Sequence, residues 1–431
     1  MIGARKIREK IKNKKAVISI IGLGYVGLPL ALEFTRKGFL VYGYDNNSRR
    51  VSKLKRGVEY ISDVKGEFAL QLIKRGRFVP TTDKKVLGKS DIIIICVPTP
   101  LRKVKIPDIS YIIMATKEIA SVMKQNTLVI LESTTYPGTC REVILPILKK
   151  ARQEKFFLAF SPERIDPGNK RYTLNRIPKV VGGIDNISAR LAAQLYRQIV
   201  KRVHIVSTLE TAEMVKILEN TFRLINIALV NEFALLAHKL GINIWEVIKA
   251  AATKPFGFMP FYPGPGIGGH CIPVDPLYIA WRAKRAGFKT KMIDLALQLN
   301  RYMPKYIVQR IKLMLKEKNI SFKKAKILVI GVAYKKDVKD LRESAALDIL
   351  EILKKEKVNM AYYDPLIPYL NIKGLKMYSV KLDRANLKGY DCVVIVTDHS
   401  NIDYKLIQQY SKLVFDTRNV YSGNFSNVRR L

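Results

Sequence analysis

Residues 16–45 read AVISIIGLGYVGLPLALEFTRKGFLVYGYD, and this stretch decides the fold of the N-terminal part of the chain. Its spacing predicts a buried strand over 16–21, a helix over 28–37 and a second strand over 39–44. Between the first strand and the helix stands GLGYVG, a GxGxxG turn that lets a pyrophosphate approach the positive end of the helix. Asp45 lies 18 residues after Gly27, about where a carboxylate binds the ribose of a dinucleotide. We therefore expect NAD, since a carboxylate would repel the 2′-phosphate of NADP.

The same stretch permits another interpretation. Three lysines at positions 12, 14 and 15 precede an uncharged run from Ala16 to Leu32, a pattern shared with signal peptides and short membrane spans. The run contains three glycines and a proline, and its length is marginal for a span. We therefore interpret it as a buried strand that turns into a helix.

Further apolar runs continue the parallel-sheet pattern. Strands are expected at 91–97, 127–131, 156–160 and 180–183. Ligands of doubly wound sheets bind at the carboxyl ends of the strands. This places Thr99, Thr134 and Glu163 on one rim, although each could equally be an ordinary turn or capping residue.

The chain is strongly basic, with 76 lysines and arginines against 36 acidic residues and a formal net charge of +40 over 431 residues. Such an excess is compatible with nucleic acid, an anionic membrane surface or anionic metabolites. The basic residues are spread along the whole length without a nucleic-acid-binding motif, so we expect neither a nucleic acid nor a membrane partner. A basic Rossmann protein that binds nucleic acid or senses redox state is the remote alternative.

The four cysteines are far apart and lack CxxC spacing; they are Cys96, Cys140, Cys271 and Cys392. This pattern predicts thiols in a reducing, cytoplasmic environment and no metal site.

A long helix is predicted over 208–240, where neither proline nor glycine interrupts the chain. Most of its residues are apolar, but Lys216, Asn220 and Arg223 recur at i, i+4 and i+7 and therefore share one face. A solvated stripe is the ordinary explanation of such a line. Because the helix is too long and apolar for a peripheral position, we expect it to span between two domains and face a cleft.

Residues 262–276 read YPGPGIGGHCIPVDP and follow a shorter predicted helix at about 242–252. Four glycines and four prolines predict neither helix nor strand here. The prolines stiffen the loop, and the glycines let its backbone approach a ligand closely. Cys271, with the carboxylate of Asp275 four residues later, is what covalent catalysis at a carbonyl requires. A buried thiol in a proline-rich connector is the alternative.

Near Lys323 the α/β pattern restarts. Strands are predicted at 325–330, 360–363, 391–397 and 413–416, with a helix from about Ser344, but the first turn lacks the GxGxxG pattern. We therefore predict an α/β protein with two Rossmann-like doubly wound parallel-sheet domains joined by a central helical domain. The expected ranges are 1–207 for the NAD-binding domain, 208–320 for the helical domain with the cysteine loop, and 321–431 for the second Rossmann-like domain.

A series of motifs resembles the UDP-glucose/GDP-mannose 6-dehydrogenase family and keeps the family's order. The motifs are GLGYVGLPLA (22–31), ESTTYPGT (132–139), SPERIDPGN (161–169), the helix with Lys216 and Asn220, PGPGIGGHCIPVDP (263–276) and GVAYKKDVKDLRES (331–344). The match runs from about Val17 to Arg418. It implies a cytoplasmic, NAD-dependent UDP-sugar dehydrogenase of polysaccharide biosynthesis, with the UDP-sugar bound by residues 321–431 and a dimer or higher homo-oligomer.

The resemblance also implies the chemistry. The C6 hydroxymethyl of the sugar is oxidised to a carboxylate with two NAD per cycle, through a thiohemiacetal and then a thioester on Cys271. Lys216 and Asn220 would stabilise the thiolate or the oxyanion. Asp275, Glu163 and Thr134 resemble the family's water- and proton-handling residues, and how Asp275 and Glu163 divide that work stays open.

Binding roles follow from the same resemblance. The residues expected at NAD are Gly22, Gly24, Tyr25, Val26, Gly27, Asp45, Pro98, Thr99, Thr134 and Arg342. Those expected at the UDP-sugar are Glu163, Arg164, Lys216, Asn220, Tyr262, Gly266, Gly268, His270, Lys335 and, more weakly, Arg418.

The catalytic loop bears on which sugar is used. Members acting on UDP-glucose typically read GGSCFPKD, whereas this chain reads GGHCIPVDP. His270 and Val274 resemble the branch that oxidises 2-acetamido sugars, and Pro273 resembles its UDP-N-acetylglucosamine members. UDP-glucose, UDP-N-acetylmannosamine and UDP-N-acetylgalactosamine are the alternatives. Residues 254–260 depart from the stretch that reaches a neighbouring subunit in UDP-glucose enzymes, which leaves the oligomeric state open.

Overall fold

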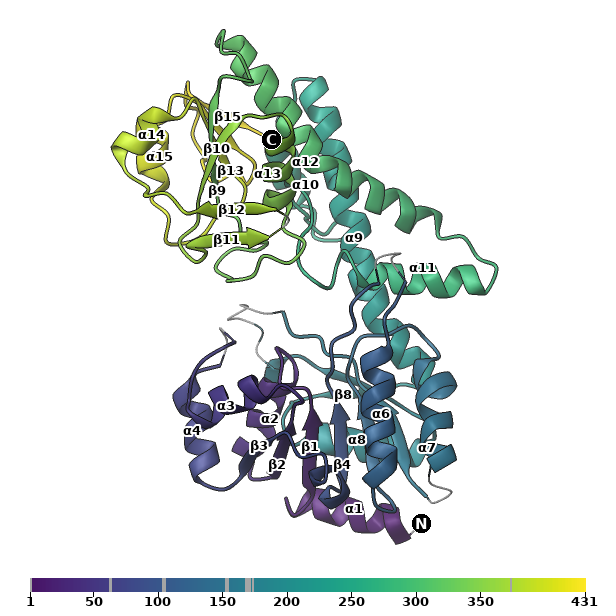
Figure 1. The fold of residues 1–431 in the computed structure, drawn as a ribbon. Helices are drawn as coiled ribbons and strands as arrows, with labels where there is room; N and C mark the ends of the chain where they lie inside the picture. The colour runs from purple at the N-terminus through teal and green to yellow at the C-terminus, as the bar shows by residue number, and fades with distance from the viewer. Residues whose placement is uncertain are drawn as a thin grey trace. The chain divides into compact units, whose positions relative to one another are not determined.

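The computed structural model describes residues 2–61, 64–102, 106–151, 155–166, 172, 174–372 and 374–431. The last part of the SPERIDPGN motif, 167–169, lies outside the described residues. The chain forms two compact units, residues 1–219 with 277–288 and residues 220–276 with 289–431. Each unit contains a parallel sheet flanked by helices (Figure 1). The predicted fold class is therefore confirmed.

The first unit contains an eight-stranded sheet in the order β3-β2-β1-β4-β5-β6-β7-β8. Its strands are β1 (Val17–Ile21), β2 (Leu40–Tyr44), β3 (Phe78–Thr81), β4 (Ile92–Ile95), β5 (Leu128–Leu131), β6 (Phe157–Phe160), β7 (Lys179–Gly183) and β8 (Val203–Ile205). All neighbours run parallel except β6 and β7, which are antiparallel. Sequence analysis missed the edge strands β3 and β8, which are short; β3 contains Pro80, which only an edge strand tolerates.

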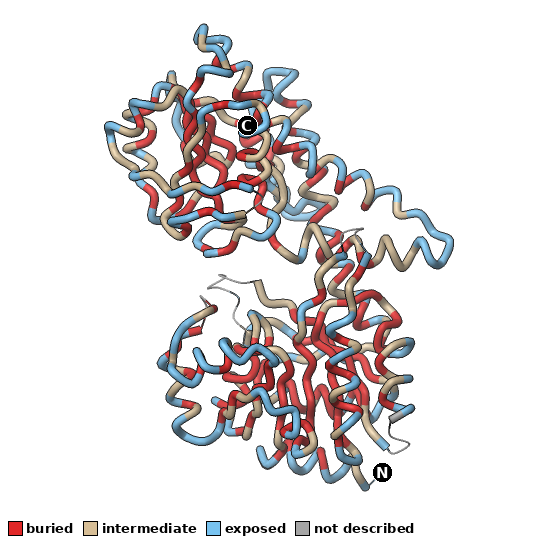
Figure 2. The backbone as a smooth tube through the Cα atoms, viewed as in Figure 1, coloured by how far each residue is buried: buried red, intermediate tan, exposed pale blue. Residues whose placement is uncertain are grey.

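Helices cover both faces of this sheet. One face carries α1 (Ile2–Lys12), α2 (Gly27–Arg36), α3 (Ser48–Lys55), α4 (Gly66–Lys74) and α8 (Asn186–Tyr196). The other carries α5 (Val86–Lys89), α6 (Ser110–Val122), the π-helix η1 (Cys140–Ile144) and α7 (Leu145–Ala151). In β4, Ile92 and Ile94 enter the first core, while Ile93 and Ile95 enter the second. Burial on both faces explains why this strand is a continuous apolar run, and Figure 2 shows the buried strands in red. A short 3-10 helix, η2 (Leu174–Arg176), precedes β7.

The N-terminal uncharged run forms β1 and then α2, as interpreted from its glycines. Within the described part of the chain, no helix has the length and apolar character needed to cross a membrane.

The second unit contains a five-stranded parallel sheet in the order β10-β9-β13-β14-β15. Its strands are β9 (Lys326–Ile330), β10 (Asn359–Tyr363), β13 (Cys392–Ile395), β14 (Val414–Asp416) and β15 (Val428–Arg430). An antiparallel pair, β11 (Tyr369–Ile372) and β12 (Leu375–Tyr378), completes its strands among the described residues. The sheet's helices are α13 (Ala345–Lys355), α14 (Arg384–Gly389) and α15 (Tyr404–Tyr410). As in the first sheet, alternate residues of β9 enter two different cores.

Four helices lie between the two sheets in sequence, namely α9 (Leu209–Lys239), α10 (Ile244–Ala251), α11 (Asp275–Arg285) and α12 (Lys291–Glu317). The predicted long helix is confirmed as α9, and the division between the units falls within it. The polar line on α9 does not share one environment, since Lys216 is half-buried, Asn220 is buried and Arg223 is exposed. Several of its apolar side chains are exposed as well, which a core helix would not show; they are Leu218, Phe222, Leu229, Phe233 and Leu236.

One prediction about the cysteine loop is wrong at its end. The sequence excluded helix over 262–276, but α11 begins at Asp275. Pro276 is compatible with this start because the first turn of a helix leaves its N–H groups without intrahelical partners.

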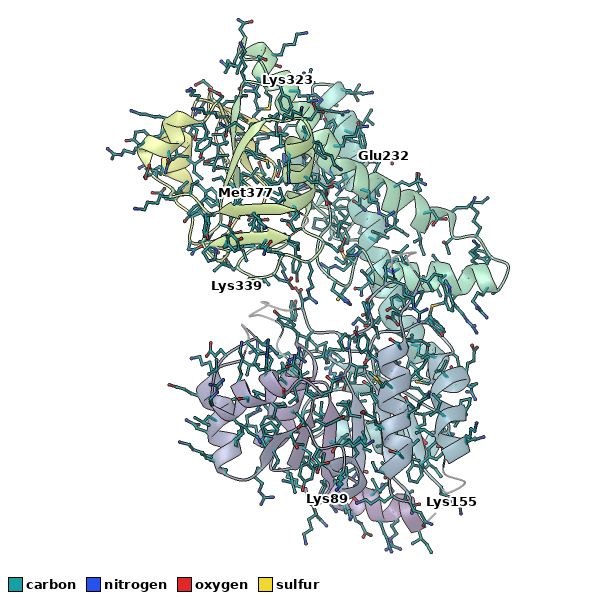
Figure 3. All side chains as sticks on the ribbon, in the orientation of Figure 1. Lys89, Lys155, Glu232, Lys323, Lys339 and Met377 are labelled. Atoms are coloured by element: carbon teal, nitrogen blue, oxygen red, sulfur yellow. The ribbon has the colours of Figure 1, made fainter. Side chains whose placement is uncertain are left out.

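Exposed lysines are distributed over both units, as their sequence positions indicated. Lys89 and Lys155 lie on the first unit, and Lys323 and Lys339 lie on the second (Figure 3).

Close packing explains two of the three glycines in the turn after β1. A Cβ on Gly27 would lie 1.9 Å from the carbonyl oxygen of Gly22. Gly22 itself has φ +92°, in the left-handed region, and its added Cβ would lie 2.6 Å from the Cys96 carbonyl oxygen. A Cβ on Gly24, by contrast, would meet nothing within 4 Å.

We therefore expect Gly27→Ala to destabilise the first unit by about 1–3 kcal/mol, because backbone must move to admit the methyl group. Gly24→Ala is the matched control and should leave the melting temperature nearly unchanged. Thermal denaturation of both variants measures the difference. Equal melting temperatures for the two variants would contradict this account of the turn.

Candidate functional site

The first unit carries the predicted dinucleotide site at the β1–α2 turn. Asp45 follows β2 and is 4% exposed. Its Oδ2 accepts a hydrogen bond from the Leu23 backbone N–H at 2.8 Å, and its Oδ1 accepts one from the Asn47 N–H at 2.9 Å. Arg50 Nη1 lies 2.7 Å from Asp45 Oδ2, an ion pair that sequence analysis missed. The carboxylate thus fixes the glycine turn.

The site has room where a pyrophosphate would approach. Gly24 has open space beside its backbone, and Tyr25 next to it is 40% exposed. The residues present therefore fit a dinucleotide at this turn, with the α2 N-terminus behind it.

Two other predicted rim residues differ in their surroundings. Thr99 is buried, and its carbonyl oxygen accepts a hydrogen bond from the Tyr278 hydroxyl at 2.5 Å. Thr134, which follows β5, is half-buried. Because Tyr278 lies on α11, the segment after the cysteine loop is attached to this rim through Thr99. Pro98, the neighbour of Thr99, is exposed.

Three groups hold the carboxylate of Glu163. Its Oε1 accepts hydrogen bonds from the backbone N–H groups of Arg164 at 2.6 Å and Ile165 at 2.7 Å, and Lys179 Nζ lies 3.0 Å from Oε2. Burial opposes its charge, but Lys179, the backbone donors and Lys216 outweigh burial and lower the pKa of Glu163. Glu163 is therefore a carboxylate that stays ionised although it is 6% exposed.

Arg164 makes a different contact from the predicted one. Its guanidinium donates to Glu219 on α9 through Nε at 3.2 Å and Nη2 at 2.5 Å, and to the Pro178 carbonyl oxygen at 2.8 Å. Through these hydrogen bonds, Arg164 links residues 161–166 to α9. Its predicted contact with the substrate stays a prediction.

The second unit carries the cysteine loop. Gly264 N–H donates to Asn231 Oδ1 at 2.9 Å, and Asn231 Nδ2 donates to Asn300 Oδ1 at 2.9 Å, so buried amides of α9 and α12 anchor the loop. Farther on, Gly269 N–H donates to the Arg342 carbonyl oxygen at 2.9 Å. A Cβ on Gly268 would lie 2.6 Å from the Tyr334 Cβ, so this part of the loop packs closely on the 331–344 turn. The loop's position is thus fixed from both sides.

Cys271 is exposed, unlike Cys96, Cys140 and Cys392, which are buried. Its carbonyl oxygen accepts the Asp275 N–H at 2.8 Å, which closes the turn into α11. Asp275 is 1% exposed, and Asn220 Nδ2 donates to its Oδ2 at 2.6 Å. The structure thus brings together three residues that sequence analysis assigned to the same chemistry.

The second unit also contains the remaining predicted substrate residues, in the cysteine loop or elsewhere in the unit, and Arg342, which was predicted to contact NAD. Arg418 Nε donates to the Val396 carbonyl oxygen at 2.7 Å, and its guanidinium lies against Gly264. Tyr262 is exposed and stacks on Trp245 with ring centroids 6.2 Å apart. Arg342 is paired with Asp340, its Nη2 lying 2.6 Å from Oδ2. The other predicted residues, Gly266, His270 and Lys335, are half-buried.

The second sheet repeats one feature of the first. Asp364 follows β10, as Asp45 follows β2, and its Oδ2 accepts the N–H groups of Val332 at 2.7 Å and Ala333 at 3.0 Å. His399 Nε2 lies 3.2 Å from the same oxygen. Sequence analysis missed this pair; an acid directly after the second strand of each sheet was the available signal. Among the described residues, no group of three or more His, Cys, Asp and Glu side chains could hold a metal ion.

Models of one protein family match three consecutive parts of the chain. Residues 16–200 match the NAD binding domain of the UDP-glucose/GDP-mannose dehydrogenase family, residues 210–302 its central domain and residues 328–423 its UDP binding domain. A UDP-N-acetyl-D-glucosamine 6-dehydrogenase from Pseudomonas aeruginosa is 34% identical, with 96% of this chain and 100% of that protein covered.

Solved structures are similar over the same length. The UDP-D-ManNAc dehydrogenase from Pyrococcus horikoshii has a TM-score of 0.87 and 34% identity, covering 96% of this chain and 98% of that one. A UDP-glucose dehydrogenase from Pyrobaculum islandicum has a TM-score of 0.85 and 25% identity, with 96% of each chain covered. The chain therefore belongs to the UDP-glucose/GDP-mannose dehydrogenase family and is an NAD-dependent UDP-sugar dehydrogenase.

Proposed function

We propose that the protein oxidises the C6 hydroxymethyl of UDP-N-acetyl-D-glucosamine to the uronic acid, with two NAD per cycle and a covalent intermediate on Cys271. The observation that carries this proposal is the exposed Cys271 on a loop anchored at both ends, one turn before the buried Asn220–Asp275 pair. NAD supplies the hydride acceptor for both oxidations. The protein's own residues must therefore activate the alcohol, hold the aldehyde and release the acid.

Cys271 would act after the first oxidation. Its thiolate sulfur adds to the C6 aldehyde, and the carbonyl oxygen becomes the oxyanion of a thiohemiacetal. Loss of hydride from C6 then gives a thioester. Water adds to the thioester carbonyl, the C–S bond breaks, and the carboxylate leaves with Cys271 regenerated. Lys216 and Asn220, one turn apart on α9, would supply a cation and an N–H donor for the oxyanion.

The two carboxylates would handle the protons. The lowered pKa of Glu163 keeps its carboxylate deprotonated, so Glu163 would accept a proton from the alcohol or from water and would not donate one. Asn220 donates a hydrogen bond to Asp275 Oδ2 and would thereby orient the carboxylate that is proposed to activate water. Thr134 is proposed to orient a water or the nicotinamide.

Binding would be divided between the two sheets. The 1–207 domain would hold NAD at the turn of Gly22, Gly24, Tyr25, Val26 and Gly27 with Asp45. The 321–431 domain would hold the UDP-sugar through Lys335 and Arg418, beside the 208–320 domain with the cysteine loop. Arg342 is proposed to contact NAD as well. We also propose a cytoplasmic location, which the dispersed cysteines and the family resemblance support.

Replacing Cys271 by alanine tests the covalent step. Cys271→Ala should still bind NAD and UDP-sugar, but uronic acid formation should fall by more than about 1,000-fold, because the aldehyde has no nucleophile. Cys392→Ala, a change at the buried thiol of β13, is the control and should retain activity. Calorimetry measures binding, and mass spectrometry measures the acid. Acid production by Cys271→Ala at the wild-type rate would contradict the mechanism.

The sugar is tested by a panel of UDP-sugars. The relatives act, by name, on UDP-N-acetylglucosamine, UDP-N-acetylmannosamine and UDP-glucose, so the choice rests on His270, Pro273 and Val274. We expect kcat/KM for UDP-N-acetylglucosamine to exceed that for each alternative, including UDP-N-acetylgalactosamine, by at least about tenfold, with two NADH per sugar. NADH absorbance measures both quantities. A higher kcat/KM for any other sugar would replace the proposed substrate and leave the reaction type intact.

We also propose a homo-oligomer that buries the exposed apolar face of α9. Together with α10 and residues 257–261, this face forms a largely apolar groove of about 700 Å³ within the second unit. Phe233 lines the groove and is 51% exposed. Monomeric proteins rarely expose a continuous apolar surface of this kind.

Charge introduced into this groove should separate the subunits. Phe233→Asp is expected to lower the mass in sedimentation analysis to that of a single chain, because a carboxylate would be buried without a partner. Leu313→Asp is the control, since Leu313 lies on α12 and is similarly exposed at 53%. Wild-type protein that sediments as a single chain would contradict the proposal.

A further inference from the structure

Behind Glu163 lies a group of buried charged and polar side chains that the proposed function does not use. Glu132, Lys179 and Tyr196 are each at most 2% exposed. Lys179 Nζ lies 3.0 Å from Glu132 Oε2, 3.0 Å from Glu163 Oε2 and 3.4 Å from the Pro162 carbonyl oxygen. The Tyr196 hydroxyl donates a short hydrogen bond to Glu132 Oε1. All three N–H donors of the ammonium are thus directed at oxygen.

The reversal between β6 and β7 explains why a lysine reaches this place. Phe160 of β6 pairs with Gly182 of β7 in antiparallel register. Continuing that register beyond the paired residues sets Glu163 opposite Lys179. Because β7 runs against β6, its first residue lies at the carboxyl ends of β5 and β6, where Glu132 and Glu163 follow those strands.

The two carboxylates that share Lys179 are not equivalent. Glu163 also accepts two backbone N–H groups and is stabilised by the charge of Lys216. Among the described residues, the hydrogen-bond partners of Glu132 are Lys179 and the Tyr196 hydroxyl. Burial accordingly raises the pKa of Glu132, while the pKa of Glu163 is lowered. Environments that push the pKa values of two neighbouring carboxylates apart are typical of sites where one of the two must act as a base.

We propose that Lys179 is a positioning residue that keeps Glu163 ionised and oriented, with Glu132 and Tyr196 holding the ammonium from the opposite side. The inference rests on the proposed function, which makes Glu163 a base. A purely structural pair would need one acid on Lys179. Burying a second acid, Glu132, costs desolvation free energy. Glu132 is the acid that fixes the position of the ammonium independently of Glu163.

Other groups face Glu163 from several elements and bear on its titration. These groups are Lys179 of β7, Glu132 after β5, Lys216 of α9, Tyr196 of α8 and Cys96 after β4. Cys96 and Tyr196 stay neutral, because burial raises the pKa of each well above its ordinary value. In the described contacts, Lys179 is hydrogen-bonded to Glu163 and Lys216 is not. Removing Lys179 should therefore change the pKa of Glu163 more than removing Lys216.

The test is the pH dependence of kcat/KM for Lys179→Met. In the wild type Glu163 ionises below the usual pH range of assays, so its protonation does not limit the rate. Without Lys179, burial raises the pKa of Glu163, and the rate falls about tenfold per pH unit below that pKa. We expect the ratio of variant to wild-type kcat/KM to be at least about tenfold lower at pH 6 than at pH 9.

Three further variants make the outcome decisive. Lys179→Arg keeps the cation and should remove most of the pH dependence of the ratio. Glu132→Gln keeps Lys179 on Glu163 and should show no new acidic limb. Glu132→Gln combined with Lys179→Met relieves the repulsion between two buried acids and should retain the limb, so it serves if Lys179→Met does not fold. A variant-to-wild-type ratio that is constant with pH would overturn the positioning role.

Glu163→Gln separates this inference from the proposed function. Wild-type activity in Glu163→Gln would remove Glu163 from the mechanism and overturn both. An inactive Glu163→Gln together with a pH-independent effect of Lys179→Met would overturn the role of Lys179 only. All assays use the full chain with NAD and whichever UDP-sugar the wild type oxidises.

Discussion

In each sheet, a buried carboxylate at the end of the second strand holds the turn that follows the first strand. Asp45 accepts the Leu23 N–H, and Asp364 accepts the N–H groups of Val332 and Ala333. Turns at the carboxyl ends of parallel strands expose backbone donors that no ladder satisfies, and an unsatisfied buried donor costs about 1–3 kcal/mol. Each carboxylate therefore stabilises the shape of the turn whose N–H groups it accepts.

Much of the fold could be predicted because periodicity reports burial. Strands β1 and β4 are buried on both faces, so their apolar runs are unambiguous. Edge strands such as β3 and β8, by contrast, carry a weak pattern, since β3 is buried only at alternate residues and no residue of β8 is buried. The start of α11 at Asp275 escaped prediction because the glycine and proline count masked a helix whose first turn tolerates Pro276.

The predicted site divides along similar lines. Cys271, Asn220 and Asp275 could be assembled from motifs, and the Asn220–Asp275 hydrogen bond joins two of them. Lys179 and Glu132 could not be assigned to the site from the sequence, because each is a single charged residue at the end of an apolar strand. Only the strand order, with its one antiparallel pair, brings them to Glu163. Sequence reports local character, whereas contacts between distant charges depend on topology.

The Glu163–Lys179 contact also bears on how the first sheet assembles. In a strand the side chains alternate between faces, so a one-residue slip of β7 along β6 would turn Lys179 toward the opposite core. That core is apolar, and a lone ammonium inside it would cost several kcal/mol. The native alignment alone satisfies the charge. The Glu163–Lys179 pair therefore disfavours a shifted register between β6 and β7, the antiparallel pair of this sheet.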